Sequence, residues 1–559
     1  MQEDTGRMKR MGLTVAAALV CGLAAAETLS EMVARDLEKP VRPGGVAGRP
    51  FWNRYSVQFM YPPAFDFSAV EGAVRYRFTV TDDVLNDHVF EAEKPTADLS
   101  PVWKDIPVGY ARVSVEGIGV NGAVCGVAGT RRFWRSAPFV PSRAWGYGEA
   151  AKRYYAYLFD QPNTVHFREH GTPDAEGLCD LPVIYPSKMN STLIQAMLRY
   201  AKLCPERREA AVLTARRVAN YMLSISQPAD ASLANFPPTY WDKANRQTNF
   251  GSIKYKGQNM LIYPAWMGDA YLDLFDVTGE RKYFDAALAI AATFERIQCP
   301  NGSWYVKIWE KDGSPVLEGG VTEPYYIIPT DIYFFFMHVA KKTGDARWTK
   351  VADKAFGYLE KGPMTTYDWA AQYEDTPPTK DYVGQSGDMA ADAALILLDR
   401  YPDDPARIEQ ARELMRWVED QFVFWKRPCR SDKRGILSEK SDVFSPAWNG
   451  SHPKYSFDNW RDVPSSTEKY AYSNPINSKT AKVMRLFLKM YRRTGDRLCL
   501  EKAKALGDGI VKVQADVGTG NIPTHFWKTD CRGDRGENDW TNCGVFTALG
   551  LEELAECRD

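Results

Sequence analysis

Residues 255–297 read YKGQN-MLIYPAWMGDAYLDLFDV-TGER-KYFDAALAIAATFERI. A polar and aromatic cluster leads into an apolar segment, Met260–Val277, then a turn at Thr278–Arg281, then a second helical segment, Tyr283–Ile297. Glycine ends helices well because it adopts the left-handed backbone conformation, and an acidic side chain is favourable in the first turn of the next helix. This stretch therefore predicts a helical hairpin whose N-terminal end carries polar and aromatic side chains.

The same kind of turn recurs along the chain. Thr343–Arg347 and Thr494–Arg497 carry Thr-Gly-Asp where the first turn has Thr-Gly-Glu, while Pro205–Arg207 and Pro402–Pro405 occupy the matching place in two other hairpins. The helix pairs repeat at roughly 60 to 75 residues, with one longer interval, and such a period is typical of a repeat architecture. The longer interval holds residues 426–470, a loop-like insertion of the kind that often shapes a binding site.

Six predicted helices begin with a cluster rich in Tyr, Trp, Asn and Gln. These clusters are residues 185–190, 255–259, 323–326, 382–388, 472–477 and 538–543. About 400 residues at this repeat length suffice for roughly six hairpins, which close naturally into a double ring of helices, an (α/α)6 toroid. An inner helix of such a ring is apolar on most sides, as Tyr326–Ala340 is. An open solenoid is the alternative, but closure is favoured because the clusters stay in phase at one end of every hairpin.

Residues 50–140 have a different period. Apolar side chains alternate in Tyr76–Thr81 and Ala111–Val115, and Pro and Gly separate the runs. Period two indicates strands with one buried face, and several short strands at this spacing predict a small antiparallel β-sandwich. Its architecture resembles a fibronectin type III or immunoglobulin-like module, for which we expect a packing or spacer role. The fold class is therefore mainly α, with the toroid at residues 145–559 preceded by this β domain.

The first 26 residues have the pattern of an export signal. Basic residues precede the apolar run Met11–Leu23, and Ala24–Ala26 offers a small-residue cleavage site. We expect a periplasmic or secreted protein with no stable membrane span once the signal is removed; an N-terminal anchor is the alternative. Since Lys and Arg number 70 and Asp and Glu 71, no basic field attracts nucleic acid. The oligomeric state is left open.

The chain resembles the six-hairpin glycosidase and polysaccharide lyase superfamily. The resemblance rests on the Thr-Gly-Asp/Glu turns, on Trp369–Asp375 and on the six clusters, and it covers residues from about 145 to 559. It implies an (α/α)6 barrel, often with a β-sandwich, and an active site at the N-terminal ends of the inner helices. The Arg-Gly-x-Gly-Trp signature of the unsaturated glucuronyl hydrolases of this fold does not occur in the sequence, so the exact family stays open.

The resemblance and the clusters together indicate a carbohydrate-active enzyme. A ring of helix N-termini with Lys188, Lys254 and Lys256 nearby favours an acidic, uronate-containing oligo- or polysaccharide as the substrate. Cleavage of its glycosidic bonds by a glycoside hydrolase is slightly favoured. A polysaccharide lyase acting by β-elimination, a sugar epimerase and a non-catalytic glycan-binding protein are the alternatives.

Hydrolysis needs two carboxyl groups, one protonated and one ionised. Asp388 and Asp539 each lie in a cluster and are the predicted pair, with Glu323, Asp331, Glu374 and Asp375 in reserve. An N-cap is the competing interpretation for any Asp at a helix start. A lyase needs a base instead, and His525 beside the last cluster is the predicted one.

Substrate binding is assigned to polar and aromatic residues of the clusters and of the segments next to them. They are Lys188, Tyr255, Lys256, Asn259, Tyr325, Trp369, Gln372, Tyr373, Gln385, Asn474, Asn477, Trp527, Trp540 and Asn542. We expect no cofactor and no metal. His166 and His170 have the i, i+4 spacing of metal ligands on a helix, but no third ligand stands out and a solvated loop is expected there. His338 is expected to be a hydrogen-bonded core residue.

Overall fold

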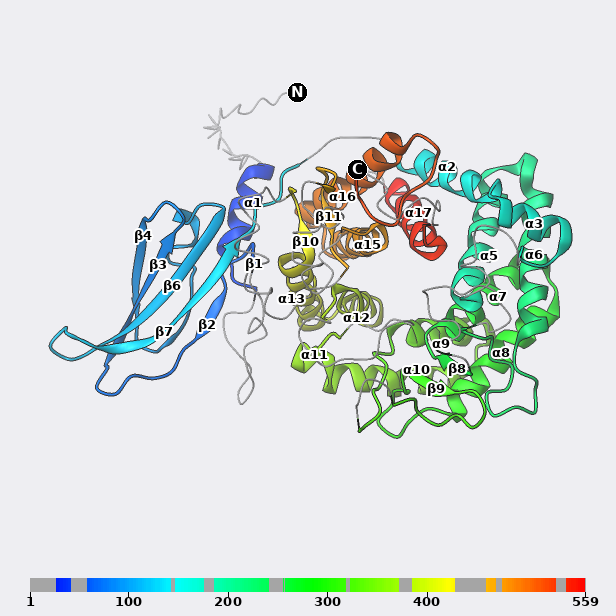
Figure 1. The fold of residues 1–559 in the computed structure, drawn as a ribbon, viewed down its shortest axis with the longest axis horizontal. Coiled ribbons are helices and arrows are strands. Elements are labelled where there is room, and N and C mark those ends of the chain that lie inside the picture. Colours follow the sequence, from blue (N-terminus) through cyan, green and yellow to red (C-terminus); the bar gives the residue numbers. More distant parts are fainter. Residues whose placement is uncertain are drawn as a thin grey trace, which may run out of the picture.

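The structure is a computed structural model of the chain. It describes residues 27–41, 58–141, 146–174, 185–240, 255, 257–317, 322–370, 385–427, 459–468, 475–528 and 539–557. A small β region lies at one end, and a ring of helices forms the rest (Figure 1). None of the described helices combines the length and the hydropathy that crossing a bilayer requires.

Six helical hairpins build the ring. Written with the inner helix first, the pairs are α5 (Pro186–Leu203) with α6 (Arg208–Ile225), α7 (Tyr263–Thr278) with α8 (Arg281–Arg296), α9 (Thr330–Thr343) with α10 (Ala346–Lys361), α12 (Gly387–Arg400) with α13 (Pro405–Phe422), α15 (Asn477–Thr494) with α16 (Arg497–Val517), and α17 (Thr541–Ala555) with α2 (Tyr147–Phe159). The last pair joins the C-terminal helix to the first helix of the ring.

The ring is closed. Contacts run from α5 to α7, α9, α12, α15 and α17, and α17 packs against α5 again. The predicted (α/α)6 toroid is therefore confirmed, and an open solenoid is excluded, because the helices that begin and end this series touch (Figure 1). The shorter helices α3 (Pro162–His170) and α11 (Pro363–Thr366) lie outside this set.

The predicted turns connect the hairpins as expected. Gly279, Gly344 and Gly495 end α7, α9 and α15 with φ of 70°, 68° and 72°, the left-handed region that glycine enters without steric cost. Asp345 and Asp496 then cap α10 and α16 by accepting a backbone N–H. Two predicted helix starts were wrong. The helix α7 begins at Tyr263, because Met260 pairs with Lys307 in a short ribbon. The helix α9 begins at Thr330, because Tyr326 pairs with Tyr305 in an isolated β-bridge.

The β region consists of a five-stranded sheet and a two-stranded ribbon. The sheet has the order β1-β7-β6-β3-β4, with β1 (Gln58–Phe59) parallel to β7 (Val124–Arg135) and the other pairs antiparallel. The remaining strands of the sheet are β3 (Arg75–Asp82), β4 (Asp87–Ala92) and β6 (Gly109–Ile118). The ribbon pairs β2 (Ala64–Asp66) with β5 (Thr96–Asp98). A small β region is thus confirmed, while its status as a fibronectin or immunoglobulin-like domain stays a prediction.

A separate apolar core holds the β region together. Phe65 of the ribbon packs edge-on or tilted against Phe59 and Phe133 of the sheet, at ring centroid distances of 5.8 and 5.9 Å. Two short ribbons decorate the helical part: β8 (Gln258–Met260) with β9 (Lys307–Trp309), and β10 (Val423–Phe424) with β11 (Ser465–Ser466). The ribbon β10–β11 lies next to the β region.

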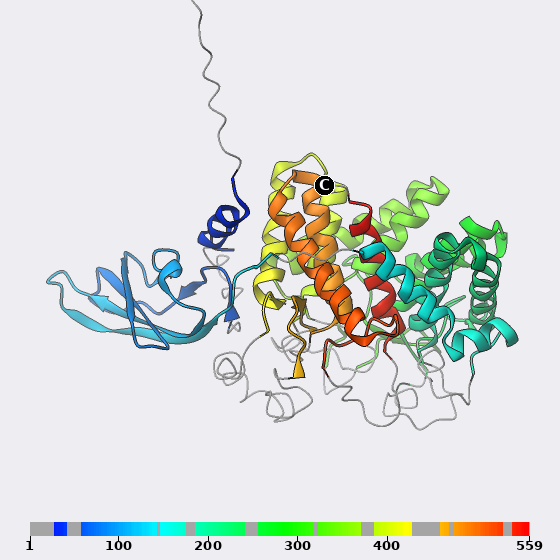
Figure 2. The ribbon, with the colours of Figure 1, turned by 90° about the horizontal axis from the view of Figure 1, so that it is seen from above.

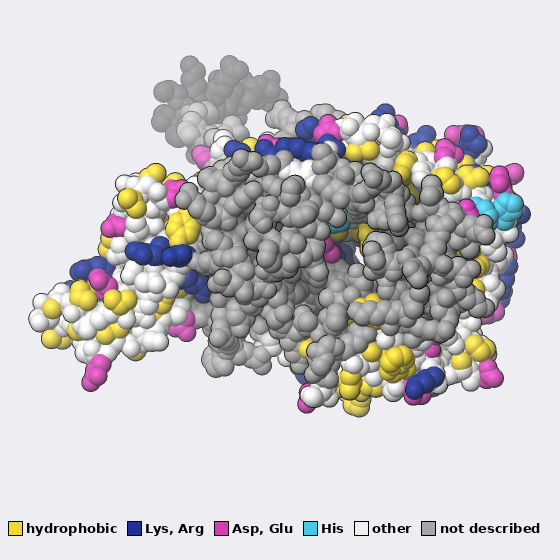
Figure 3. Space-filling view, in the orientation of Figure 1, with side chains coloured by type: hydrophobic (Ala, Val, Ile, Leu, Met, Phe, Trp, Pro, Cys, Tyr) yellow, Lys and Arg dark blue, Asp and Glu magenta, His cyan; other side chains and the backbone are white. Residues whose placement is uncertain are grey.

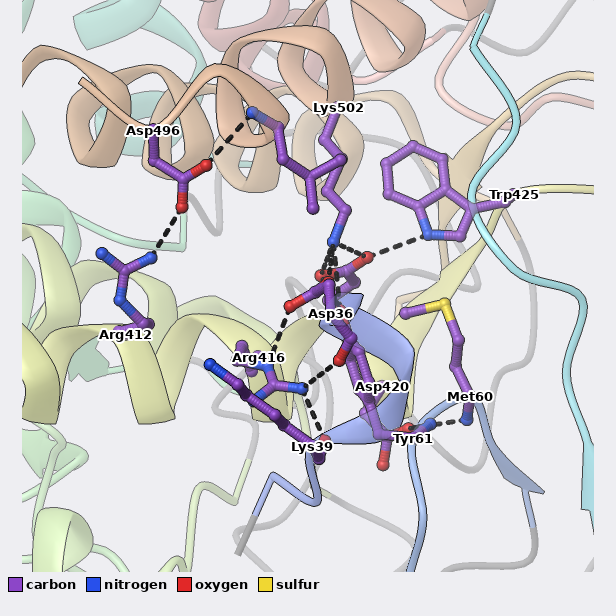
Figure 4. Close-up of polar contacts among 12 residues, drawn as sticks. Asp36, Lys39, Met60, Tyr61, Arg412, Arg416, Asp420, Trp425, Asp496 and Lys502 are labelled. Carbon is purple, nitrogen blue, oxygen red and sulfur yellow. Dashed lines mark hydrogen bonds and ion pairs between the residues drawn. The ribbon is translucent and has the colours of Figure 1, made fainter. Parts of the chain in front are cut away.

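The β region lies beside the outer helices α13 and α16 (Figures 1 and 2). Helix α1 (Leu29–Glu38) and strand β1 contact these helices. Figure 4 shows the polar contacts at this junction: Lys502 of α16 binds Asp36 of α1, Tyr61 and Glu419 of α13. Asp420 accepts the backbone N–H groups of Met60 and Tyr61. The proposed signal, residues 1–26, lies outside the described residues.

Candidate functional site

The inner helices are buried on all sides but one. In the first three turns of α15 the only side chains that are not buried are Lys479, Lys482 and Arg485, and in α7 they are Trp266, Asp269 and Asp273. These positions recur every three or four residues and therefore form one stripe per helix. Because neighbouring inner helices and an outer helix cover the other faces, each stripe points toward the axis of the ring.

The side chains in the first two turns of these stripes, together with Trp540 before α17, form a group that we call the N-terminal layer. It comprises Lys188 of α5, Trp266 of α7, Asp331 of α9, Asp388 and Asp392 of α12, Lys479 and Lys482 of α15, and Trp540 at the start of α17. All six inner helices contribute. Lys188 lies on the Trp540 ring and Asp388 contacts Lys479 and Lys482, while the prediction that all these residues line one site stays a prediction.

Two aspartates and two lysines form the charged part of the N-terminal layer. Lys479 makes an ion pair with Asp388, and Lys482 lies 3.3 Å from Asp388 Oδ1 and 2.7 Å from Asp392 Oδ2. Thr330 of α9 donates to Asp392 over 3.4 Å. One ammonium group thus bridges two carboxyl groups that stand one helical turn apart on α12.

The two carboxyl groups have pKa values displaced in opposite directions. Burial alone would raise the pKa of Asp388, but Lys479 and Lys482 outweigh it and lower that pKa to about 2. Burial raises the pKa of Asp392 to about 6; Lys482 opposes this effect, while the charges of Asp331 and Asp388 add to it. A carboxylate beside a carboxyl group that holds its proton up to mild acidity is the combination that acid–base chemistry requires.

Trp266 extends the N-terminal layer away from the charged part. Its indole Nε1 donates to Asp331 Oδ1 over 2.9 Å. Its ring packs edge-on against Tyr263 and against Phe546 of α17, with centroid distances of 5.1 and 5.0 Å. Aromatic side chains therefore adjoin the aspartates, as they do where proteins hold the apolar face of a sugar.

A row of rings and two lysines forms the other side of the N-terminal layer. The Lys188 ammonium is 3.7 Å from the centre of the Trp540 ring, and Trp540 stacks on Tyr185 at 5.9 Å. The row continues through Tyr240 to Tyr255, whose ring lies 4.1 Å from the ammonium of Lys307. Lys188 and Lys307 are 6% and 3% exposed, so both cations are held on aromatic faces with little water around them.

Several predicted binding residues are buried with structural partners. Asn259 donates to the Pro237 carbonyl, and Gln385 links the Trp369 amide to Asp368. Trp369 is fully buried and presents no face for stacking. Asn477 donates to the Ile522 carbonyl, and Asn542 is buried in the first turn of α17. Tyr325 is half-buried. The predicted Lys256, Gln372, Tyr373 and Asn474 lie outside the described residues.

Asp539 connects a loop to α17. Its two carboxyl oxygens accept from Asn521 Nδ2 at 2.5 Å and from the Thr524 amide at 2.7 Å, and the Thr524 hydroxyl accepts from the Trp540 amide. These bonds position Trp540 in the N-terminal layer. The contacts therefore give Asp539 a positioning role, and its catalytic role stays a prediction.

His525 and Trp527 lie on the side of the ring that faces the β region. Their rings stack at 4.3 Å with an interplanar angle of 7°. Trp527 belongs to an apolar cluster with Trp460, Phe424 and Trp134, and Trp134 is part of β7. Trp527 therefore helps to join the ring to the β region, and the predicted base His525 lies on top of it.

A second titratable pair lies deeper in the ring. His338 of α9 lies with its Nδ1 3.0 Å from Oδ1 of Asp269 on α7. Burial alone would lower the pKa of His338, but the neighbouring Asp269 outweighs burial and raises that pKa. For the carboxyl group of Asp269, burial raises the pKa to about 6. The hydrogen-bonded partner expected for His338 is present, but the side chain belongs to an inward stripe and is 24% exposed.

The structure corrects one expectation about histidines and adds one finding about metals. His166 and His170 lie on helix α3, where a solvated loop was expected, and their ring centroids are 4.4 Å apart. Among the residues that the structure describes, no group of three or more His, Cys, Asp or Glu side chains could hold a metal ion.

Sequence reasoning missed Asp392, Lys479, Lys482 and Trp266. Each lies inside a helix, beyond the cluster that marks its start. The available signal was charge at helical spacing within apolar segments: Asp388 and Asp392 differ by four positions, and Lys479 and Lys482 by three.

Comparison with known proteins gives similarity of a general kind only. No protein-family model matches the chain, and no curated protein has significant sequence similarity to it. Among solved structures, cellobiose 2-epimerase from Spirochaeta thermophila is 14% identical, with 73% of this chain and 96% of that chain covered and a TM-score of 0.46. A family 76 glycoside hydrolase from a bovine Bacteroides thetaiotaomicron strain is 10% identical, with coverages of 89% and 98% and a TM-score of 0.45. A D-mannose isomerase is 11% identical, with coverages of 74% and 99% and a TM-score of 0.47. The fold assignment rests on the helix contacts described above.

Proposed function

We propose that this protein is a carbohydrate-active enzyme that hydrolyses glycosidic bonds in an acidic, uronate-containing oligo- or polysaccharide. The observation that carries the proposal is the N-terminal layer, which contains the Asp388–Lys482–Asp392 bridge together with Trp266 on Asp331 and Lys188 on Trp540. Glycoside hydrolysis needs an acid, an ionised carboxylate and a surface that holds a sugar, and these side chains supply all three.

In this proposal Asp392 is the proton donor and Asp388 the ionised group. Asp392, with a pKa of about 6, keeps its proton at mildly acidic pH and delivers it to the leaving oxygen. Asp388, with a pKa of about 2, is negative at the same pH and acts on water or on the sugar carbon. Lys482 touches both carboxyl groups and therefore sets their relative charge.

The acidic character of the substrate is supported by the cations beside the rings. Lys188 over Trp540 and Lys307 over Tyr255 place positive charge along the aromatic row. The N-terminal ends of the inner helices add partial positive charge to the same end of the ring. A uronate offers both an apolar ring face and a carboxylate to such a surface.

The test is turnover of uronate polymers by the purified protein, followed by two signals. Hydrolysis releases reducing ends only, whereas elimination also creates a conjugated double bond that absorbs ultraviolet light. We expect reducing ends without the absorbing product, and a fall in kcat/KM as the pH rises through about 6, because Asp392 then loses its proton. Absorbing product in proportion to the new chain ends would assign the protein to the lyases.

Two matched variants locate the chemistry. Asp392→Asn removes the donor and is expected to lower kcat by roughly 100- to 10,000-fold. Asp399→Asn on the same helix, whose carboxylate is 53% exposed and pairs with Lys489 and Arg493, is the control and should leave kcat unchanged. Equal activity of the two variants would remove Asp392 from the mechanism.

Proton transfer at a sugar carbon, as in an epimerase, is the second candidate. The His338–Asp269 pair favours it, because the carboxylate orients the imidazole and helps it to stay protonated. Uptake of deuterium from heavy water into unchanged sugar would indicate this reaction. Loss of that uptake in His338→Ala, with hydrolysis absent in the wild type, would replace the hydrolase proposal.

A further inference from the structure

The exposed face of the β sheet carries an unusual row of side chains. Strands β3, β6 and β7 bury Phe78, Val113 and Phe133 on one face, so the residues between them lie on the other. In register across the strands, that other face presents Thr81, Arg112 and Arg132 in one row and Thr79, Ser114 and Thr130 in the next. Hydroxyl groups thus flank two arginines.

Arg112 and Arg132 are direct cross-strand partners, and both are exposed. Side chains in this relation start about 5 Å apart, and like charges there destabilise a sheet. Within the described part of the chain, neither guanidinium forms an ion pair. Asp87 on β4 is the register partner of Thr81 in the same row, and its carboxylate accepts from the Thr81 hydroxyl, while the two guanidinium groups face the solvent together.

The same face shows what a compensated arrangement looks like. Arg75 lies 2.8 Å from Glu91, and Arg77 lies 3.7 Å from Glu91 and 4.0 Å from Glu116. These arginines are neutralised by acids on the neighbouring strands. Arg112 and Arg132 lie on the same face of the same sheet but form no such ion pairs among the residues that the structure describes. Arg75 and Arg77 therefore serve as the matched control.

The arginine row adjoins the junction with the helical ring. The next register pair on this face is Tyr110 with Trp134, and Trp134 is only 5% exposed because Phe424, Trp460 and Trp527 of the ring cover it. Successive positions on one face of a strand are about 7 Å apart. The arginines therefore lie one register pair away from Trp134, which clusters with Trp527 of the ring.

A short segment connects this junction to the N-terminal layer. Thr524 binds Asp539 and the Trp540 amide, and Trp527, three residues later, joins the cluster with Trp134. The same segment thus positions Trp540 at one end and packs against Trp134, next to the arginine row, at the other. Basic side chains are visible on the surface of the β region in Figure 3.

We propose that Arg112 and Arg132 form a second binding site, which takes anionic groups of the acidic polysaccharide whose reacting sugars occupy the N-terminal layer. This inference rests on the proposed function, since it extends the binding surface for the same polymer. Two guanidinium groups fit carboxylate or sulfate oxygens, and the hydroxyls of Ser114 and Thr130 fit sugar hydroxyls. Two arginines without a described ion-pair partner, on a chain of net charge -1, give too weak a positive potential to bind a nucleic acid.

The experiment measures binding of the full-length protein to de-esterified polygalacturonate by calorimetry at low salt. The double variant Arg112→Ala/Arg132→Ala is expected to bind about tenfold more weakly, since each lost contact is a charge-assisted hydrogen bond partly screened by water. The control, Arg75→Ala/Arg77→Ala, removes the same formal charge but should bind like the wild type. Methyl-esterified polymer, which lacks the charge, should bind all three proteins equally weakly.

Folding and catalysis are monitored in the same proteins. The melting temperature of the Arg112→Ala/Arg132→Ala variant should equal or exceed that of the wild type, because a like-charge contact is removed. Its kcat on a short acidic oligosaccharide, which does not reach the β region, should be unchanged. If the wild type fails to turn that oligosaccharide over, the proposed function fails while the binding result still stands by itself.

Three results would overturn the inference. They are equal affinity of the wild type and the Arg112→Ala/Arg132→Ala variant for polygalacturonate, equal weakening in both double variants, and tighter binding of a single-stranded oligonucleotide than of the acidic polysaccharide. The second would show that only net charge matters, and the third would assign the arginines to a different polyanion.

Discussion

Replacing Lys502 by Met should weaken the junction between the N-terminal segment and the ring. Lys502 is 4% exposed, and its ammonium group lies 2.8 Å from Asp36 Oδ2, 2.9 Å from Glu419 Oε2 and 3.0 Å from the Tyr61 hydroxyl (Figure 4). Glu419 is fully buried, so the substitution leaves a carboxyl group without its main cation and without water.

The expected loss of folding free energy follows from this geometry. Removing one partner of a buried ion pair costs about 3 to 5 kcal/mol, because the other charge stays buried and uncompensated. In the variant Arg416 still lies 3.6 Å from Asp36 and compensates part of the negative charge of that carboxylate. The expected loss is therefore near the lower limit, about 3 kcal/mol. Denaturant unfolding followed by circular dichroism measures it, through the midpoint at a constant slope.

Two further variants make this prediction refutable. Lys512→Met on the same helix removes a lysine that is 60% exposed and pairs with Asp516. It should lower the free energy of unfolding by about 0.5 kcal/mol at most. Adding Glu419→Gln to Lys502→Met removes the stranded charge and should restore part of the loss. A Lys502→Met variant no less stable than Lys512→Met would refute the reasoning.

Three other outcomes are expected. Burial raises the pKa of Asp420 from its ordinary 3.8 to about 7, so the folded state binds this proton more tightly than the unfolded state. The free energy of unfolding should therefore fall as the pH rises from about 4 to about 7. Denaturant midpoints measured across this pH range should show a smaller fall in Asp420→Asn. Gly544→Ala places a methyl group against the Tyr154 hydroxyl and should cost about 1 to 3 kcal/mol, whereas Gly357→Ala, which meets open space on α10, should be neutral or stabilising in thermal unfolding. Trp540→Ala removes a ring of the N-terminal layer and should raise KM for the acidic oligosaccharide about tenfold, consistent with the loss of an aromatic platform; an unchanged KM would exclude stacking there.

The hairpins were predictable because their signals are local. Gly279, Gly344 and Gly495 need only a left-handed residue after a helix, and Asp345 and Asp496 need only the next amide groups to cap. Ring closure was also predictable, since clusters in phase at the start of each inner helix imply a common end. The contact of α17 with α5 and α2 bears that out.

The chemistry of the N-terminal layer was not predictable to the same degree. The pKa values of Asp388 and Asp392 depend on Lys479 and Lys482, which are about 90 positions away and reach them only because α12 and α15 are neighbours in the ring. The cluster of residues 382–388 includes Asp388 but ends one helical turn before Asp392.

The direction of a side chain was a second obstacle. His525 and Trp527 alternate with Thr524 and Phe526 along an extended segment, so Trp527 packs on the β region although Thr524, three residues earlier, binds Trp540. Only the tertiary partner Trp134 shows which way they point. Residues buried by their partners, such as Trp369, show the same limit, because composition does not distinguish a stacking ring from a packed one.

A crystal structure of Asp392→Asn with an acidic oligosaccharide tests the site most directly. We expect a sugar ring stacked on Trp540 or Trp266, its scissile bond between Asp388 and the substituted position 392, and a uronate carboxylate near Lys188. A ligand bound only outside the N-terminal layer, with those side chains untouched, would contradict the assignment of the active site to this end of the ring.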